Sequence, residues 1–132
     1  MAGSSWLKVT PWGIRQAINW ASRQFGQPDI YITENGFSDL LSNLDDLQRV
    51  YYYKHYINQV LKSIVYDGIS VKGYYAWSLL DNFEWAMGYT EKFGLHSVNM
   101  SDPERQRTPK QSSHFLSRLV AENGFVEDQN IC

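Results

Sequence analysis

A glutamate that follows a predicted strand is the first candidate for chemistry. Glu34 comes directly after the short apolar run at 30–33 and precedes Asn35-Gly36, which turns the chain away. A carboxylate at the end of a buried parallel strand is held rigidly at the edge of the sheet where α/β proteins place their ligands. A solvated glutamate in a turn is the alternative, and the same tripeptide at 122–124, at a predicted helix end, fits ordinary capping. Only its place in the fold therefore separates Glu34 from a surface residue.

A second candidate is the segment from Trp77 to Trp85, which leaves the end of another predicted strand. It holds two indoles and the carboxylate of Glu84 within nine residues. Sugar recognition uses this combination, because an aromatic face packs on the axial C–H groups of a pyranose and a carboxylate accepts two hydroxyl hydrogen bonds. In the alternative, both indoles are buried and Glu84 is a surface residue. Loops seldom bury two tryptophans so close together, and each would need a partner for its N–H group, so the pattern favours a sugar-binding loop.

Helices and strands alternate along the chain around these two segments. Thr10 and Pro11 are typical of a helix start, since a threonine can cap the helix and a proline needs no N–H group at its first position. The predicted elements, in order, are a helix over 11–25, a strand over 30–33, a helix from a cap at Asn43 to 65, a strand over 71–80, a ring-rich loop over 81–93, a short strand over 94–100, and a helix opened by Thr108 and Pro109 and closed at 123–124. This alternation predicts a parallel α/β sheet.

The central predicted helix, with Asp45 and Asp46 in its first turn, has the most regular pattern. The tyrosines at 51–53 straddle its apolar stripe, which favours packing over ligand recognition. The stripe itself is expected to face the core and consists of Leu47, Val50, Tyr51, Ile57, Val60, Leu61, Ile64 and Val65. Two principal strands cannot bury the apolar faces of three helices, because a doubly wound sheet or a barrel needs several more neighbours. We therefore expect the chain to be a piece of a larger fold.

The composition excludes several classes of protein. In 132 residues, 12 Lys and Arg against 14 Asp and Glu give a net charge of -2, which leaves no basic excess for binding nucleic acid. A hydrophobic content of 43% is typical of a globular protein, and no apolar run reaches the length of a membrane span or forms a signal-peptide core near Met1. The single cysteine, Cys132, excludes an intramolecular disulfide, and the scattered His55, His96 and His114 do not predict a metal site.

Three linked motifs resemble glycoside hydrolase family 1, the retaining β-glycosidases that include β-glucosidases, lactase and myrosinases. The run at 31–36, Tyr-Ile-Thr-Glu-Asn-Gly, looks like the nucleophile signature of that family. The segment at 77–85 looks like its sugar-binding segment, and Gly-Tyr at 88–89 with Phe-Gly-Leu at 93–95 continues the pattern. The likeness extends from Trp6 to Phe125, which makes it far more specific than any one motif.

The resemblance implies a role for each candidate residue. Glu34 would be the nucleophile at the end of the seventh strand of a (β/α)8 barrel, and Trp77 would stack under the sugar. Glu84 and Trp85 would hold its hydroxyl groups, and Phe93 would shape the same wall. The expected substrate is a small-molecule β-glycoside, hydrolysed without a cofactor or metal. A carboxylate at the position of Glu84 also speaks against phosphorylated sugars, because it would repel a phosphate.

The chain departs from the family in what it lacks. A retaining mechanism needs a second carboxyl group about 5–5.5 Å from the nucleophile, and the Asn-Glu-Pro motif that carries it in the family does not occur here. A barrel takes about 200–250 residues, so residues 1–132 are expected to be the last two βα units of the catalytic domain. Two functions stay open: a part of an active β-glycosidase, or a truncated family member that binds sugar weakly without turnover. The open barrel edges of an incomplete fold would also favour self-association.

Overall fold

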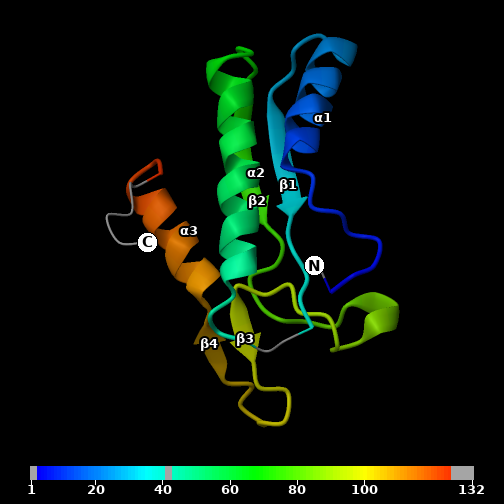
Figure 1. Ribbon diagram of the computed structural model, residues 1–132, viewed down its shortest axis with the longest axis vertical. Coiled ribbons are helices and arrows are strands. Elements are labelled where there is room, and N and C mark those ends of the chain that lie inside the picture. Colours follow the sequence, from blue (N-terminus) through cyan, green and yellow to red (C-terminus); the bar gives the residue numbers. More distant parts are fainter. Residues whose placement is uncertain (1–2, 41–42, 126–132) are drawn as a thin grey trace.

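The computed structural model describes residues 3–40 and 43–125, and Cys132 lies outside them. Its elements follow the order helix, strand, helix, strand, and then a short hairpin and a last helix (Figure 1). They are α1 (Pro11–Gln24), β1 (Ile30–Asn35), α2 (Leu47–Val65), β2 (Val71–Ala76), the 3-10 turn η1 (Trp85–Met87), β3 (His96–Val98), β4 (Arg107–Pro109) and α3 (Gln111–Ala121). Within the described residues, no helix is both long and apolar enough to span a membrane.

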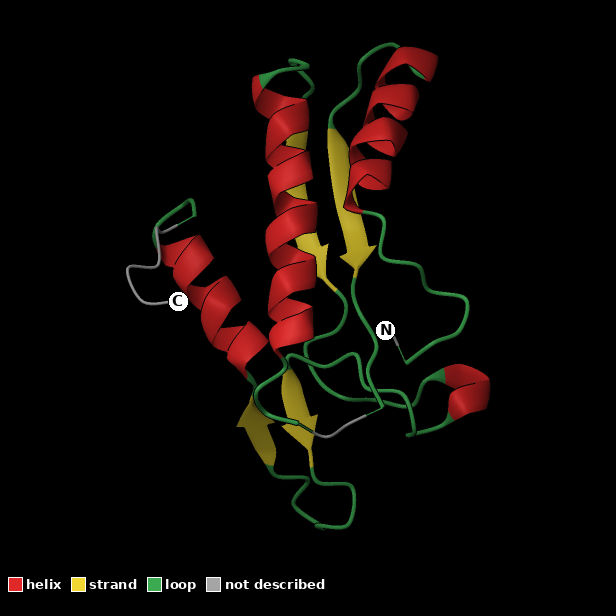
Figure 2. Cartoon of the chain, viewed as in Figure 1, coloured by secondary structure: helices red, strands yellow, loops and turns green. Residues whose placement is uncertain are grey.

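β1 and β2 pair in parallel, as the alternation of helices and strands predicts. Ile30 lies opposite Val71 at one end of the pair, and Asn35 lies opposite Ala76 at the other. Figure 2 shows α1 and α2 side by side over the same two strands, and Ile18 of α1 packs in one cluster with residues of α2 and of both strands. The unit is therefore two neighbouring strands of an α/β sheet with the helices that cover one face.

The end of the chain differs from the prediction. The strand expected over 71–80 ends at Ala76, and the strand expected over 94–100 is shortened to β3, which pairs antiparallel with β4. β4 contains Thr108 and Pro109, which the sequence pattern assigns to the start of the last helix. The helix begins later because the backbone N–H of Lys110 donates to the carbonyl of Leu95 at 2.9 Å, which keeps the chain extended for one more residue. A proline is tolerated in such an edge strand because its missing N–H is not needed.

The predicted stripe of α2 is wrong for most of its members. Leu47, Tyr51, Leu61, Ile64 and Val65 are exposed, whereas the buried side of the helix carries Arg49, Tyr52, Tyr53, Tyr56, Val60 and Ser63. Hydropathy misses this face because its polar groups are satisfied inside the protein. The hydroxyl of Tyr56 accepts the backbone N–H of Thr10 at 2.9 Å, for example, and Arg49 donates to the carbonyl of Phe37 at 3.0 Å.

The start of α2 also lies further along the chain than predicted. Asp46 is the residue that precedes the first helical residue, Leu47, so Asp45 and Asp46 are outside the first turn. The side chain of Asn43 accepts the backbone N–H of Asp45 at 3.0 Å and caps a turn instead of the helix. Asp46 is buried and pairs with Arg49, which explains why the helix begins there.

Candidate active site

The carboxyl ends of β1 and β2 meet and form the floor of the candidate site. The backbone N–H of Trp77 donates to the carbonyl of Asn35 at 2.8 Å, directly after the last paired residues of both strands. The chain then passes so close that a Cβ atom on Gly36 would lie 1.8 Å from the carbonyl oxygen of Trp77. Only glycine fits there, so the Gly of the Glu-Asn-Gly turn is required by the contact between the two strand ends.

All five residues that the sequence singles out line one cavity of about 390 Å³ at these strand ends: Glu34, Trp77, Glu84, Trp85 and Phe93. Glu34 is exposed to it, and Trp85 is 83% exposed, whereas Phe93 is only 5% exposed. Trp77 and Glu84 are half-buried. A buried ring, an accessible carboxylate and an open indole therefore share one concave surface, which is the pattern of a site for a ligand with apolar faces and polar edges.

The two carboxylates of the cavity interact with each other. Burial raises the pKa of Glu84 above its ordinary value, and the nearby charges of Glu91 and Glu34 act in the same direction. The indole N–H of Trp77 donates to Glu84 and opposes this rise in pKa, because the hydrogen bond favours the ionised form. Glu84 is thus a carboxylate that one indole orients while its other lone pairs remain available to a ligand.

The loop that carries Glu84 and Trp85 is fixed at both of its ends. A carboxylate oxygen of Asp81, at the start of the loop, accepts the backbone N–H of Gly94 at 2.9 Å and the ammonium group of Lys110 at 2.9 Å. Asp81 and Lys110 are both buried, so this ion pair is held inside the protein. Between these ends, the backbone N–H of Glu84 donates to the carbonyl of Gly88 at 2.7 Å and closes the turn η1. The loop can therefore present its side chains in a fixed geometry.

Asn35, the neighbour of Glu34, anchors the end of β1 from below. Its side-chain amide donates to the hydroxyl of Tyr52 at 3.0 Å and accepts the hydroxyl of Tyr74 at 2.7 Å. Burial raises the pKa values of both phenols, so they stay neutral and keep their O–H groups for these bonds. The residue beside Glu34 is thus locked in place, which limits how far Glu34 can move.

Three further residues that line the cavity, Trp6, Leu7 and Tyr52, are not predicted from the sequence. Trp6 is 70% exposed and lies in the lining beside Leu7, although it belongs to no helix or strand whose pattern would place it. Tyr52 also lines the cavity, although the sequence pattern at 51–53 favours packing over ligand recognition. Tyr52 and Tyr53 are indeed buried, whereas Tyr51 is 58% exposed. The distribution of the remaining titratable residues adds no metal site: the described residues contain no group of three His, Cys, Asp or Glu side chains that could hold an ion.

A strand-end cavity with an accessible carboxylate, at the carboxyl edge of a parallel sheet covered by helices, is typical of enzymes built on an α/β barrel. Residues 1–125 match the model of glycosyl hydrolase family 1, and the chain belongs to this family. It is 48% identical over 128 residues to the lactase/phlorizin hydrolase of Rattus norvegicus, and 44% identical over 126 residues to beta-glucosidase 42 of Arabidopsis thaliana. These matches cover 96% and 90% of the chain.

Solved structures agree with the sequence comparison. The chain resembles the beta-glucosidase from Trichoderma harzianum with a TM-score of 0.86 and 43% identity, over 92% of this chain and 27% of that one. The predicted fold class, an α/β segment of a (β/α)8 barrel, is confirmed. The chain spans about a quarter of the length of these β-glucosidases, including 25% of the Arabidopsis protein. It spans only 7% of the much longer lactase/phlorizin hydrolase.

Proposed function

We propose that this chain is part of a retaining β-glycosidase that hydrolyses the O-glycosyl bond of small-molecule β-glycosides. The observation that supports the proposal is the joint lining of one cavity by Glu34, Trp77, Glu84, Trp85 and Phe93. Relatives with the printed names lactase and beta-glucosidase belong to the same family. On this proposal, residues 1–132 are a partial catalytic domain that works inside a complete barrel.

Glu34 is the proposed nucleophile. Its ionised carboxylate attacks C1 of the sugar, and the bond from C1 to the leaving oxygen breaks while a second carboxyl group protonates that oxygen. Water then attacks C1 from the same side that the leaving group vacated, the second group takes up the proton of the water, and Glu34 is released as a carboxylate. Its accessibility in the cavity supports this role, since the attacking oxygen must reach C1 directly.

The other four residues are proposed to bind the sugar. Trp77 and Phe93 supply apolar faces, and Trp85, the most exposed ring of the cavity, closes over the hydroxyl side. Glu84 accepts hydroxyl hydrogen bonds. Its raised pKa would suit an acid as well, but the indole donor of Trp77 stabilises its ionised form, which favours the binding role.

A non-catalytic family member is the alternative. The 132 residues contain no Asn-Glu-Pro tripeptide, which is where the family resemblance would place the acid/base glutamate. We therefore expect no turnover from these 132 residues alone, and we expect them to self-associate through the free edges of β1 and β2, which form a sheet of two strands. Turnover by the isolated chain that Glu34→Gln abolishes would contradict this expectation.

The test of the proposed function compares two glutamates in the same tripeptide. Both Glu34 and Glu122 precede Asn-Gly, but Glu122 follows α3 on the surface. In the complete protein that contains this chain, Glu34→Gln is expected to lower the hydrolysis of an aryl β-glucoside by about 10⁴-fold or more, and Glu122→Gln is expected to leave it unchanged. Full activity of Glu34→Gln would refute the assignment of the nucleophile.

A further inference from the structure

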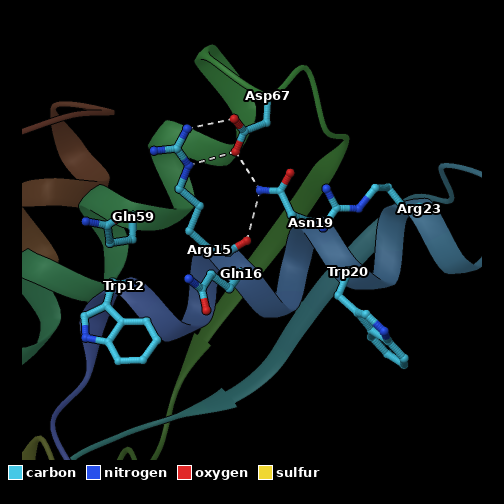
Figure 3. A pocket seen from close by; sticks show the side chains of 8 residues that line it. All are labelled: Trp12, Arg15, Gln16, Asn19, Trp20, Arg23, Gln59 and Asp67. Atoms are coloured by element: carbon cyan, nitrogen blue, oxygen red, sulfur yellow. Dashed lines mark hydrogen bonds and ion pairs between the residues drawn. The ribbon is translucent and has the colours of Figure 1, made fainter.

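A second cavity, of about 640 Å³, lies on the outside of the molecule between α1 and the end of α2, and it shares no lining residue with the Glu34 cavity. Both Trp12 and Trp20 of α1 line this cavity, and Gln16 lies between them along the helix (Figure 3). Both indoles are 59% exposed. Trp20 packs edge-to-face on Phe25, with the ring centroids 5.9 Å apart, and still remains largely accessible.

These residues share the side of α1 that faces away from the described strands. An α-helix turns by about 100° per residue, which places Trp12, Gln16, Arg23 and Trp20 within an arc of about 80°. Ile18, which is buried against the sheet side, lies on the opposite side of the helix. These side chains therefore point away from β1 and β2.

The floor of this outer cavity is rigid. Arg15 donates two hydrogen bonds to Asp67, at 2.8 and 2.7 Å, and the amide of Asn19 donates to the same carboxylate at 2.6 Å (Figure 3). The hydrogen bonds from Arg15, which have the largest effect, and from Asn19 lower the pKa of Asp67 to about 2. The pair joins α1 to the turn after α2, so the charge of Arg15 is compensated and the spacing of the two elements is set.

The polar groups that remain are mostly neutral. Within the described residues, the side chains of Gln16, Gln59 and Arg23 make no hydrogen bond to the protein. Of these polar groups, Gln16 lies between the two indoles, Gln59 of α2 lies beside Trp12, and Arg23 follows Trp20 (Figure 3). Amides beside indoles match a chain of hydroxyl groups with apolar ring faces, because amides both donate and accept. One uncompensated cation gives little attraction for a phosphate backbone, which depends on several.

We propose that this outer cavity is a second, non-catalytic site that binds a β-linked oligosaccharide. Eight residues separate Trp12 from Trp20, which is roughly 12 Å along the helix axis, so a ligand that touches both rings is longer than one sugar. The site would hold a polymeric or glycan-borne substrate against the outside of the enzyme. It does not depend on the role of Glu34, because none of its residues belongs to the other cavity.

The test is calorimetric titration of the complete protein with cellotetraose and laminaritetraose, with glucose as the short probe. A Glu84→Gln/Trp85→Ala background weakens the inner cavity and leaves the outer one intact. In that background we expect one binding event for a tetrasaccharide and none for glucose. Trp12→Ala and Trp20→Ala are each expected to weaken it about three- to tenfold, and Trp12→Phe less. Tyr51→Ala, which removes an equally exposed ring elsewhere on α2, is expected to have no effect.

Several results would overturn the outer site. The first is that neither tetrasaccharide binds to the background variant, and the second is that binding survives in Trp12→Ala/Trp20→Ala. The third is a dimer, seen in sedimentation, that Trp12→Ala dissociates, since a second copy of the chain would then occupy the cavity. Unchanged far-UV circular dichroism, and unchanged hydrolysis of a small aryl β-glucoside when Trp12→Ala and Trp20→Ala are made without the Glu84→Gln/Trp85→Ala background, verify that the tryptophan variants fold. Failure of the proposed function would instead appear as inactivity of the protein with the outer binding preserved.

Discussion

The tripeptide Glu-Asn-Gly occurs twice in this chain, and the two copies are built into different surroundings. At 34–36 it ends a parallel strand, its asparagine hydrogen-bonds to the buried Tyr52 and the half-buried Tyr74, and its glycine lies against the backbone of the neighbouring strand end. At 122–124 it follows α3, where Asn123 takes a positive φ of 49° and the nearest atom to a Cβ on Gly124 would be 3.9 Å away. The second copy terminates a helix, and any similar turn would serve.

The comparison shows which physical features make a candidate site out of three common residues. In the first copy each residue has a separate contact or opening: Glu34 faces a cavity, Asn35 is anchored, and Gly36 permits the close approach of Trp77. In the second copy, the chain needs only a residue that tolerates a positive φ. Paired substitutions in the two copies test this difference, and all are to be measured in the complete protein.

The glycines give the largest expected contrast. Gly36→Ala places a methyl group 1.8 Å from the carbonyl oxygen of Trp77, so the strand ends must separate. We expect a loss of about 3 kcal/mol or more in the free energy of unfolding, together with loss of sugar binding. Gly124→Ala is expected to cost less than about 0.5 kcal/mol, since its Cβ would make only an ordinary contact, 3.9 Å from the carbonyl oxygen of Glu122. Urea unfolding curves of both variants measure these losses. Equal unfolding midpoints would show that the two glycines contribute equally to stability and would contradict the difference between the two copies.

The asparagines give the next contrast. Asn35→Gly removes a donor to Tyr52 and an acceptor for Tyr74, which leaves buried hydroxyl groups unpaired, and about 1–3 kcal/mol of stability is expected to be lost. Asn123→Gly relieves a positive φ and is expected to be neutral or slightly stabilising. The same urea experiment measures both. A larger loss at position 123 than at position 35 would show that the tyrosine contacts are unimportant.

The smallest effect concerns Glu84, which lines the same cavity as Glu34. Glu84 has a pKa raised by burial and by nearby charges, and it must be ionised to accept sugar hydroxyls. Lowering the pH therefore protonates Glu84 earlier than an ordinary glutamate, and sugar affinity is expected to fall by up to about tenfold per pH unit below that pKa. Titrating a β-glucoside into Glu34→Gln between about pH 4 and 7 measures the fall. Glu84→Gln in the same background is expected to bind more weakly without this pH dependence, and an unchanged profile would assign the titration to another group.

The sequence predicts the parallel pair and the cavity for one reason. Parallel strands that follow one another in an α/β unit end at the same edge, so Glu34 and the segment at 77–85 had to meet once both were placed at strand ends. Glu34 and the candidates at 77–85 needed no knowledge of side-chain packing, whereas Phe93 was implied only by the family resemblance. The sequence did not predict Trp6 as a lining residue of the cavity, because Trp6 precedes α1 and belongs to no helix or strand whose pattern would orient it.

The rest depends on partners that are distant along the chain. Arg49 is fully buried against Asp46 and Asp39, and Lys110 is fully buried against Asp81, so the charged residues of these pairs occupy places that hydropathy assigns to apolar side chains. The hairpin of β3 and β4 likewise follows from pairing across a turn and overrides the local helix-start signal. Such long-range satisfaction of polar groups leaves no pattern in a short window of sequence.

Trapping of a covalent intermediate tests the central claim most directly. A fluorinated β-glucosyl fluoride reacts with a retaining glycosidase to give a glycosyl-enzyme that breaks down slowly, so mass spectrometry of its peptides can locate the bond. We predict one sugar per protein molecule, on the peptide that contains Glu34, and none on the peptide that contains Glu122. A label on Glu84, or turnover of an aryl β-glucoside by a protein that never becomes labelled, would contradict the account.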